Sequence, residues 1–226
     1  MSGIGTLNEK PLHAALKEFY AHPGDRFEVK VDGFFIDIVQ GDLLIEIQTG
    51  NFASLKSKLT KLTQERRVRL IYPIAIEKWI VKVPQEEGGR IIRRKSPKRG
   101  RVEELFWEMV SFPHLLAHPN FSLVVVMTNE EEVRYFNPNL NWRKRGWGTV
   151  ERRLLDVVEQ VVFESPADWR SLLSENIETF TTKELAKNSG ISQKLAQKMA
   201  YCLRKAEVIE WVGKRGRANL YKAVNS

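Results

Sequence analysis

The amino-acid sequence predicts an α/β fold, with a mixed sheet in residues 1–164 and a smaller helical domain over residues 165–226. Three observations support this prediction. A helix-like segment precedes three strand-like runs and a second helix-like segment, further β-branched runs follow, and a new series of helix start signals begins at Ser165. A chain of 226 residues is long enough for one sizeable domain and one small one.

The composition is that of an ordinary globular protein with an excess of positive charge. No apolar run is long enough to span a membrane and the N-terminus lacks a signal-peptide core, so we expect a cytoplasmic protein without membrane contact. The single cysteine, Cys202, excludes an intrachain disulfide and a zinc site built from several thiolates. The net charge is +8, and residues 165–226 hold 11 basic and 6 acidic residues, a difference of 11 − 6 = +5. This charge favours a polyanionic partner.

The first predicted helix covers residues 7–20, because apolar residues recur with helical spacing from Leu12 to Phe19. Pro11 fits this helix only in its first turn, where its missing N–H costs no intrahelical bond. Glu9 lies on the side of the apolar stripe. Two interpretations of Glu9 stay open: it stabilises the helix N-terminus through the helix dipole, or it reaches the acidic site that the following strands predict.

Two adjacent antiparallel strands are predicted over residues 34–39 and 43–48, on either side of Gln40-Gly41-Asp42. Both runs are apolar on both faces, which is typical of a sheet that is covered on each side. Each run nevertheless holds one acid, Asp37 in the first and Glu46 in the second. Because a buried carboxylate is costly unless a partner offsets its charge, two acids in one hairpin indicate a site.

The length of the turn decides whether these acids meet. Side chains alternate along a strand, so Glu46 and Gln48 share one face. A turn of two or four residues places Asp37 opposite Leu44 or Glu46 on that same face, whereas a three-residue turn places it on the other face. In the first case two carboxylates and one amide converge, and oxygen ligands of this kind suit a hard divalent cation such as Mg²⁺.

An Asp followed by Glu-x-Gln, on consecutive strands before a helix, resembles the PD-(D/E)XK nuclease superfamily. The resemblance covers about residues 5–85, where the predicted order α-β-β-β-α-β is that of the restriction-endonuclease-like core. It implies a cofactor, Mg²⁺ or Mn²⁺, and it places Gln48 where the superfamily usually has lysine. Gln48 would then orient water or phosphate. The metal ligands that the resemblance implies are Glu9, Asp37, Glu46 and the carbonyl of Ile47.

A second helix is predicted over residues 52–65, and it carries Lys56 and Lys58 on either side of its buried stripe. In the resembled fold this helix begins close to the metal. Either lysine is therefore a candidate for the cation that is missing at Gln48, where it would stabilise charge on a phosphate and its attacking water. The alternative is an ordinary solvated helix lysine, and spacing does not decide between the two.

The middle of the chain gives fewer functional signals. The basic, Gly-containing segment 85–101 is too polar to pack and predicts a mobile loop or a β-turn excursion, either solvated or in contact with nucleic-acid phosphates. His114 and His118 have a metal-like spacing, but prolines bracket them and no acid or cysteine accompanies them, so we interpret them as structural. Residues 154–163 fit a strand by their valines and a helix by their acid spacing. Further strands are predicted over 26–31, 68–74, 79–83 and 121–127, and a helix over 102–110.

The C-terminal domain begins with Ser165-Pro166, a helix N-cap followed by proline at the first helical position. A short helix is predicted to about residue 174, a second helix from Thr181 through Lys187, and a third from Ser192 to about residue 206. Strands are then predicted over 208–212 and 218–224. This order resembles a winged helix-turn-helix domain, which implies a long helix in a DNA major groove and a hairpin tip on phosphate or minor groove. Winged helices also serve as protein-interaction modules, which is the alternative. The implied DNA-binding residues are Gln193, Lys194, Gln197, Lys198, Tyr201, Arg204, Lys214, Arg215 and Arg217.

Together these resemblances imply a metal-dependent DNA nuclease, with Asp37, Glu46, Gln48, Lys56 and Lys58 as its catalytic candidates and DNA rather than RNA as its partner. Gln48 in place of lysine supports a second hypothesis, a non-catalytic DNA-binding regulator or assembly factor with a degenerate nuclease fold. A third is a subunit that cuts only with a partner protein. A homodimer stays open as well.

Overall fold

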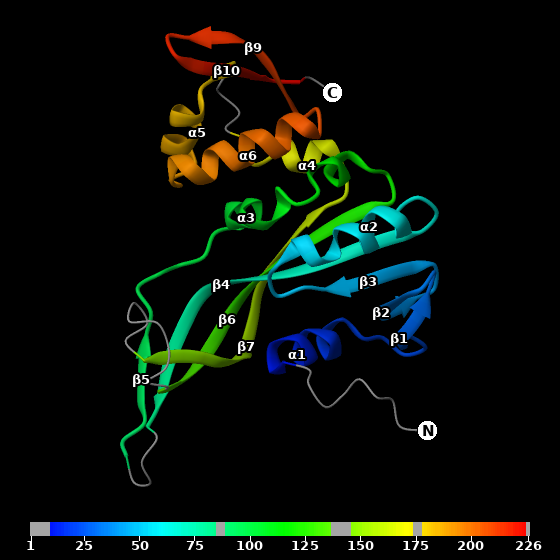
Figure 1. The fold of residues 1–226 in the computed structure, drawn as a ribbon, viewed down its shortest axis with the longest axis vertical. Helices are drawn as coiled ribbons and strands as arrows, with labels where there is room; N and C mark the ends of the chain where they lie inside the picture. Colours follow the sequence, from blue (N-terminus) through cyan, green and yellow to red (C-terminus); the bar gives the residue numbers. More distant parts are fainter. Residues whose placement is uncertain (1–9, 85–88, 137–145, 174–177, 225–226) are drawn as a thin grey trace.

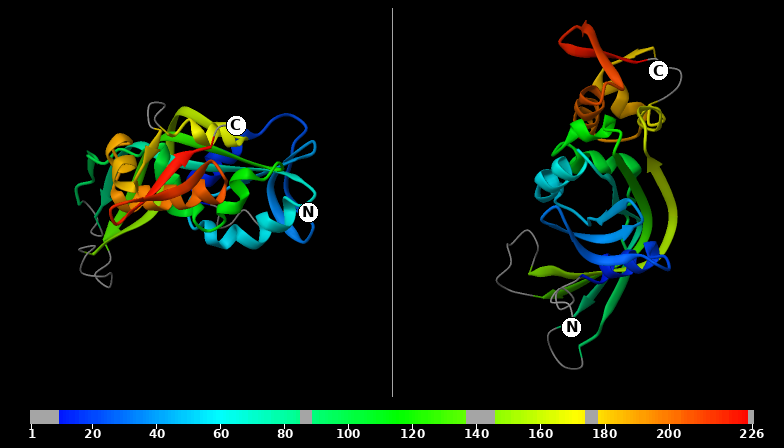
Figure 2. Two further views of the ribbon diagram at one scale, coloured as in Figure 1. Left: turned by 90° about the horizontal axis from the view of Figure 1, so that it is seen from above. Right: turned by 90° about the vertical axis from the view of Figure 1, so that its right-hand side faces the viewer.

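The structure is a computed structural model, and it describes residues 10–84, 89–136, 146–173 and 178–224 (Figure 1). The architecture is mixed α/β, with a seven-stranded sheet and a separate three-stranded sheet near the C-terminus. The three-stranded sheet lies at one end of the long axis of the molecule (Figures 1 and 2). The ends of β4 and β6 that lie beside β5 extend toward the opposite end, away from the C-terminal elements (Figure 1). Within the described ranges, no helix has both the length and the apolar character needed to cross a membrane.

The large sheet has the strand order β1-β2-β3-β4-β6-β7, with β5 paired to β4. The first three strands form an antiparallel meander, β4 runs parallel to both β3 and β6, and β7 runs antiparallel to β6. This mixed sheet confirms the predicted α/β class. The strands are β1 (Arg26–Val31), β2 (Phe34–Gln40), β3 (Leu43–Ile47), β4 (Arg67–Val83), β5 (Ile92–Lys95), β6 (Phe121–Phe136) and β7 (Trp147–Phe163).

Helices cover both faces of this sheet. The first helix buries Leu12 and Leu16 in one cluster with Ile38 and Ile45, whereas the neighbouring strand residues belong to a second cluster that contains the apolar side chains of α2. The expectation of a hairpin buried on both sides is therefore correct. The helices of this part, including short 3-10 segments labelled η, are α1 (Pro11–Tyr20), η2 (Phe52–Leu55), α2 (Lys56–Leu62), η3 (Val102–Leu105), α3 (Phe106–Met109) and η4 (Pro113–Ala117).

Two tight turns fix the register of the meander. Asp32 and Gly33 join β1 to β2 with φ angles of 50° and 92°, the left-handed pair that a two-residue type I′ hairpin turn requires. Gly41 and Asp42 join β2 to β3, and they are again a two-residue connection. The sequence predicts the first turn outright and leaves the length of the second open.

The strand predictions for residues 68–74 and 79–83 are wrong in one respect, because both belong to the single strand β4. The pairing of β4 with β6 continues through the residues between the two predicted strands, with only a register shift between Ala75 and Glu77. A bulge of this kind accommodates one extra residue and bends the strand without ending it. The long bent strands β4 and β6 result from this.

Other segments differ from their predicted lengths or types. The predicted helix 52–65 divides into η2 and α2 and ends at Leu62, and the helix predicted over 102–110 divides into η3 and α3. Part of the polar segment 85–101 is not a loop, because Ile92–Lys95 pairs with β4 through its backbone as β5 while its side chains stay exposed. The ambiguous residues 154–163 are strand, in β7.

The C-terminal elements follow the order predicted for residues 165–226, with one additional short strand. The capping boxes Ser165–Asp168 and Thr181–Glu184 and the Ser192 N-cap start their helices as expected. A small sheet with the order β8-β10-β9 follows. The elements are α4 (Pro166–Arg170), β8 (Thr179–Phe180), α5 (Thr182–Asn188), α6 (Gln193–Lys205), β9 (Ile209–Arg215) and β10 (Ala218–Ala223).

The C-terminal elements pack directly on the N-terminal part through Trp169. Its indole ring stacks on Phe163, with 4.1 Å between ring centroids, and its Nε1–H donates to the carbonyl of Leu116 at 2.9 Å. The apolar residues of α6 belong to the same cluster as those of α2 and α3. Trp169 therefore connects the two predicted domains through one continuous core.

Trp169→Phe is expected to lower the free energy of unfolding by about 2 kcal/mol, because it shrinks a buried ring and leaves the Leu116 carbonyl without its donor. Urea denaturation followed by circular dichroism measures the change. Trp211→Phe is the matched control, since Trp211 is half-exposed on β9. Equal stability losses in the two variants would contradict this account of the interface.

Candidate functional site

The two acids of the β2–β3 hairpin lie one position beyond its last paired residues, Ile38 and Ile45, and the charge of Asp37 acts on Glu46. Ile38 pairs with Ile45 and Val39 with Leu44, so the same register sets Asp37 opposite Glu46. Directly opposed residues project to the same face of a sheet, which here is the face covered by α2. The two-residue turn thus produces the arrangement in which the acids meet.

Asp37 is held by two neighbours. Its Oδ2 accepts a hydrogen bond from the backbone N–H of Ile47 at 2.7 Å and lies 3.3 Å from Nε2 of His13 on α1. Burial by itself raises the pKa of Asp37, but these two contacts, with the charges of His13 and Lys58, outweigh burial and hold the pKa below its usual value. Asp37 is therefore ionised at neutral pH.

The environment of Glu46 shifts its pKa in the opposite direction from that of Asp37. Glu46 is 7% exposed, and Nζ of Lys58 lies 2.5 Å from its Oε2. This close approach is that of an ion pair between a buried carboxylate and an ammonium. Burial, followed by the nearby charge of Asp37, raises the pKa of Glu46 to about 7, although Lys58 acts against the shift.

The structure brings one of the two candidate lysines to the acids. Lys58 extends from α2 to Glu46 and also donates to the carbonyl of Phe35 at 2.5 Å. Lys56 is exposed, and its charge acts on His114, whose pKa is lowered by burial and then by this lysine. Of the two candidate lysines on this helix, Lys58 therefore contacts the acidic site and Lys56 is exposed to solvent.

Gln48 does not contact the carboxylates through its amide nitrogen. That nitrogen donates to the carbonyls of Gly50 and Asn51, the second at 3.2 Å, and so holds the turn between β3 and η2. Glu9 lies outside the described residues. His13 was missed by the sequence analysis, and its only signal was a titratable side chain beside the apolar stripe of the first helix.

The residues present are compatible with a divalent cation at Asp37 and Glu46. Two carboxylates face one site, and the Glu46 Oε2 that lies beside Lys58 has a second lone pair that a cation could use. Among the described residues, no three His, Cys, Asp or Glu side chains form a group that would hold a metal by themselves. A cation here would need further oxygen ligands, such as the predicted Ile47 carbonyl.

The raised pKa of Glu46 predicts a pH-dependent stability difference from Glu46→Gln. The folded state holds the Glu46 proton more tightly than the unfolded chain, so this residue costs stability as pH rises from about 4.5 to about 7. The free energy of unfolding of Glu46→Gln minus that of the wild type is therefore expected to depend on pH. Above that window this difference should be more favourable to the variant, by on the order of 2 kcal/mol, than it is at acidic pH. Chemical denaturation across pH in a metal chelator measures this gain; a difference that does not change with pH would contradict it.

The predicted DNA-binding side chains of α6 lie on its open side. Leu195, Met199 and Leu203 face the core, whereas the predicted residues are exposed or, for Lys198, half-buried. Nζ of Lys194 and Nζ of Lys198 lie 6.0 Å and 5.6 Å from the ring centroid of Trp107 on α3. The exposed residues are Gln193, Lys194, Gln197, Tyr201 and Arg204.

The β9–β10 hairpin presents its cations unequally. Lys214 and Arg217 are exposed near the Gly216 turn. Arg215 instead donates to Glu184 at 2.6 Å and to Thr179 Oγ1 at 3.2 Å, so it links the hairpin to the start of α5. Arg215 is also exposed, but its guanidinium is engaged by Glu184 and Thr179.

The two histidines near η4 make separate local contacts. Nε2 of His114 lies 3.5 Å from Thr60 Oγ1, and Nδ1 of His118 accepts from the backbone N–H of Asn120 at 3.2 Å. These contacts tie η4 to α2 and to the start of β6.

Comparison with known proteins gives a family without assigning an activity. Over 222 residues the chain is 30% identical to a protein of Treponema pallidum (strain Nichols) described as "Uncharacterized protein", and the match covers 97% of this chain and 87% of that protein. No solved structure matches significantly. Residues 10–164 match the family described as Domain of unknown function (DUF8091), and the chain belongs to that family.

Proposed function

We propose that this protein is a metal-dependent DNA nuclease of the PD-(D/E)XK type. The observation that supports the proposal most strongly is the pair of opposed carboxylates, Asp37 and Glu46, with the Lys58 ammonium beside Glu46. Placing two acids in an otherwise apolar hairpin costs folding free energy. A hydrolytic site that needs both charges accounts for that cost.

The chain's own groups then have distinct roles. Asp37 is kept ionised and fixed in place by the Ile47 N–H and by His13. Lys58 comes from a different element than the acids and is placed to stabilise negative charge on a phosphate. A bound divalent cation would supply an activated water and offset charge on the scissile phosphate. Gln48 acts as a positioning residue, because its amide orders the turn that follows β3.

DNA is the proposed substrate because of the C-terminal elements. The open side of α6 presents amides, cations and Tyr201, a mixture suited to base edges and phosphates. Lys214 and Arg217 at the hairpin tip add two charges for the backbone. The winged helix-turn-helix arrangement proposed for residues 165–226 would hold DNA while the acidic site acts on it.

The test is a digest of supercoiled, linear and single-stranded DNA with Mg²⁺, with Mn²⁺ and with a chelator. Lys58→Met is expected to lower the cleavage rate about a hundredfold, because a cation beside the reacting phosphate is lost. Lys56→Met, from the same helix, is expected to leave the rate within about twofold. Equal effects of the two substitutions would contradict the role given to Lys58.

A non-catalytic DNA-binding protein is the second candidate, and one observation favours it. The Gln48 amide is committed to the turn, and Lys58 already neutralises Glu46, so the acids are partly satisfied without a metal. Salt-dependent DNA binding with no cleavage under either metal would support this candidate and reject the nuclease.

A further inference from the structure

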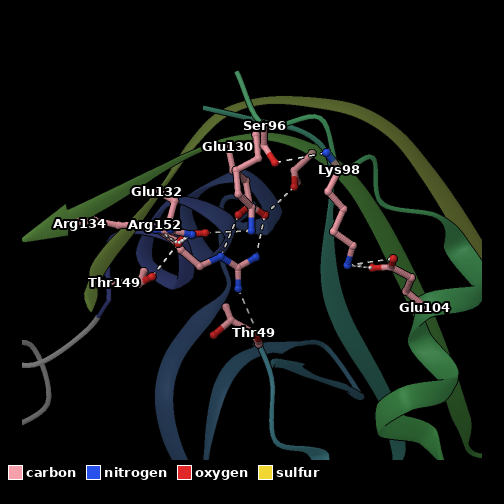
Figure 3. Close-up of polar contacts among 11 residues, drawn as sticks. Thr49, Ser96, Lys98, Glu104, Glu130, Glu132, Arg134, Thr149 and Arg152 are labelled. Atoms are coloured by element: carbon pink, nitrogen blue, oxygen red, sulfur yellow. Dashed lines mark hydrogen bonds and ion pairs between the residues drawn. The ribbon is translucent and has the colours of Figure 1, made fainter. Parts of the chain in front are cut away.

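A second polar site lies beyond the end of β3, where β4, β6 and β7 curve past the turn at Thr49. It is a cavity of about 400 Å³, within the size range of small-molecule sites. Its charged lining comes from four separate segments, as Figure 3 shows in part. The charged lining residues are Lys78, Lys98, Glu104, Glu132, Arg134 and Arg152.

One ion pair with a buried carboxylate lies next to this cavity, and its arginine, Arg152, belongs to the lining. Glu130 is completely buried, and Arg152 donates to its two oxygens through Nε at 2.8 Å and Nη2 at 2.9 Å. The hydroxyl of Thr128 adds a third bond to Glu130 at 2.8 Å. Nη1 of Arg152 reaches the carbonyl of Thr49 at 3.2 Å. Figure 3 shows the guanidinium between Glu130 and Thr49.

A second carboxylate, Glu132, organises the adjacent wall. Lys78 lies 3.1 Å from its Oε2, while Arg134 and the Thr149 hydroxyl bond to its Oε1 at 2.7 Å and 2.6 Å. Burial alone raises the pKa of Glu132, but these donors outweigh it and lower the pKa to about 2. Glu132 therefore stays ionised and holds both cations in fixed positions.

Residues 96–100 form another wall of the cavity, and backbone hydrogen bonds hold this segment against β4. Gly100 N–H donates to the carbonyl of Ala75 at 2.9 Å, and Ser96 N–H to the carbonyl of Lys78 at 2.7 Å. A Cβ at position 100 would lie 2.4 Å from the Ala75 oxygen, so only glycine allows this close approach. The cavity is thus formed by the fold before any ligand arrives.

The donors of this site exceed the acceptors that the protein supplies. In the described part of the chain, Glu132 is the only partner of the Lys78 ammonium, which has three N–H groups, and Nη1 of Arg134 has no partner. Four lining cations face two lining carboxylates, and one net positive charge remains when Glu130 is included. The unused donors of Lys78 and Arg134 are directed by the buried Glu132, which is the arrangement that binds an oxyanion. Lys98 also lines the cavity, and its exposed ammonium lies 3.1 Å from Glu104, a pair that an anion would have to share.

We propose that this cavity binds a phosphate monoester of a nucleotide, through Lys78, Arg134 and Lys98. A phosphate monoester supplies three strong acceptor oxygens and up to two negative charges. The cavity is too small for a duplex, so the phosphate belongs to a free nucleotide or to the end of a strand. That the ligand is a nucleotide rests on the proposed nuclease function, whereas the anion site itself does not.

Binding is tested by calorimetry of the full chain in a metal chelator, so that cleavage plays no part. The ligands are inorganic phosphate, a nucleoside monophosphate, and one DNA strand prepared with a terminal phosphate or a terminal hydroxyl. Saturable binding of the phosphate ligands at one site is expected. Arg134→Gln and Lys98→Met should each weaken it about tenfold, because each removes a charge-assisted donor.

Controls separate this site from general attraction to a basic protein. Lys82→Met, on the same strand as Lys78, and Arg153→Gln, beside Arg152, should leave the affinity within about twofold, since neither residue lines the cavity. Lys98 has a 74% exposed side chain, so its substitution tests the site without disturbing the fold.

The ligand series separates the two sources of the phosphate. Binding of the DNA strand only when it carries a terminal phosphate identifies the strand end as the ligand, whereas binding of the nucleoside monophosphate alone identifies a free nucleotide. No saturable phosphate binding, or equal weakening by the control variants, would overturn the proposal. Because no metal is present, that failure would leave the nuclease proposal standing.

Discussion

Asp37→Asn and Glu46→Gln are each expected to lower the rate of DNA cleavage by about a thousandfold or more. Each substitution keeps the size of the side chain and removes one of the two charges that face each other across the hairpin. Asparagine at position 37 still offers an oxygen to the Ile47 N–H, so the strand pairing is retained. Glutamine at position 46 removes a buried charge but also takes the counter-ion from Lys58, so the folded state of each variant is checked by circular dichroism before its cleavage rate is compared.

The matched control is Asp42→Asn, in the turn of the same hairpin, where the side chain is 77% exposed. Its cleavage rate is expected to equal that of the wild type. A second measurement, thermal unfolding without DNA, reports metal binding independently of cleavage. Mg²⁺ should raise the melting temperature of the wild type and of Asp42→Asn, but not of Glu46→Gln. Undiminished cleavage by Asp37→Asn would eliminate the proposed site, whatever the melting curves show.

The acidic hairpin was predictable from sequence because its signals are local. Period-two alternation places Glu46 on a defined face, and the short connection restricts where Asp37 can lie. The remaining uncertainty was the turn length, which the structure gives as two residues. The helix starts at Ser165, Thr181 and Ser192 were predictable for the same reason, since each cap is recognised within four residues.

Contacts between distant segments were not predictable in this way. Lys56 and Lys58 flank the same buried stripe of one helix, and only the placement of α2 over β2 and β3 brings Lys58 to Glu46. His13 meets Asp37 because α1 lies beside the hairpin, which no local pattern specifies. The cavity lined by Lys78 and Arg134 depends on β4 continuing between the predicted strands 68–74 and 79–83, and on the ion pair of Glu130 with Arg152, residues more than 20 positions apart.

Arg152→Met is expected to reduce the free energy of unfolding by about 3–5 kcal/mol, because it leaves the Glu130 carboxylate buried without its counter-ion. Only the Thr128 hydroxyl would then remain on a side chain with no solvent exposure. The same substitution frees the Thr49 carbonyl, so the turn after β3 should also become less protected from hydrogen exchange. Urea denaturation measures the first effect and amide exchange of the Thr49–Asn51 turn the second.

The neighbouring Arg153→Met is the control for this prediction. Arg153 also pairs with a glutamate, but its side chain is 52% exposed, and exposed ion pairs add little to stability. The double variant Glu130→Gln/Arg152→Met is expected to be more stable than Arg152→Met alone, since the uncompensated charge is then absent. If the stability losses of Glu130→Gln and Arg152→Met simply added up in the double variant, the two residues would not act as a buried pair. That result would remove the proposed role of the Glu130–Arg152 pair in stabilising the floor of β6 and β7, whereas Lys78 and Arg134 would still be held by Glu132.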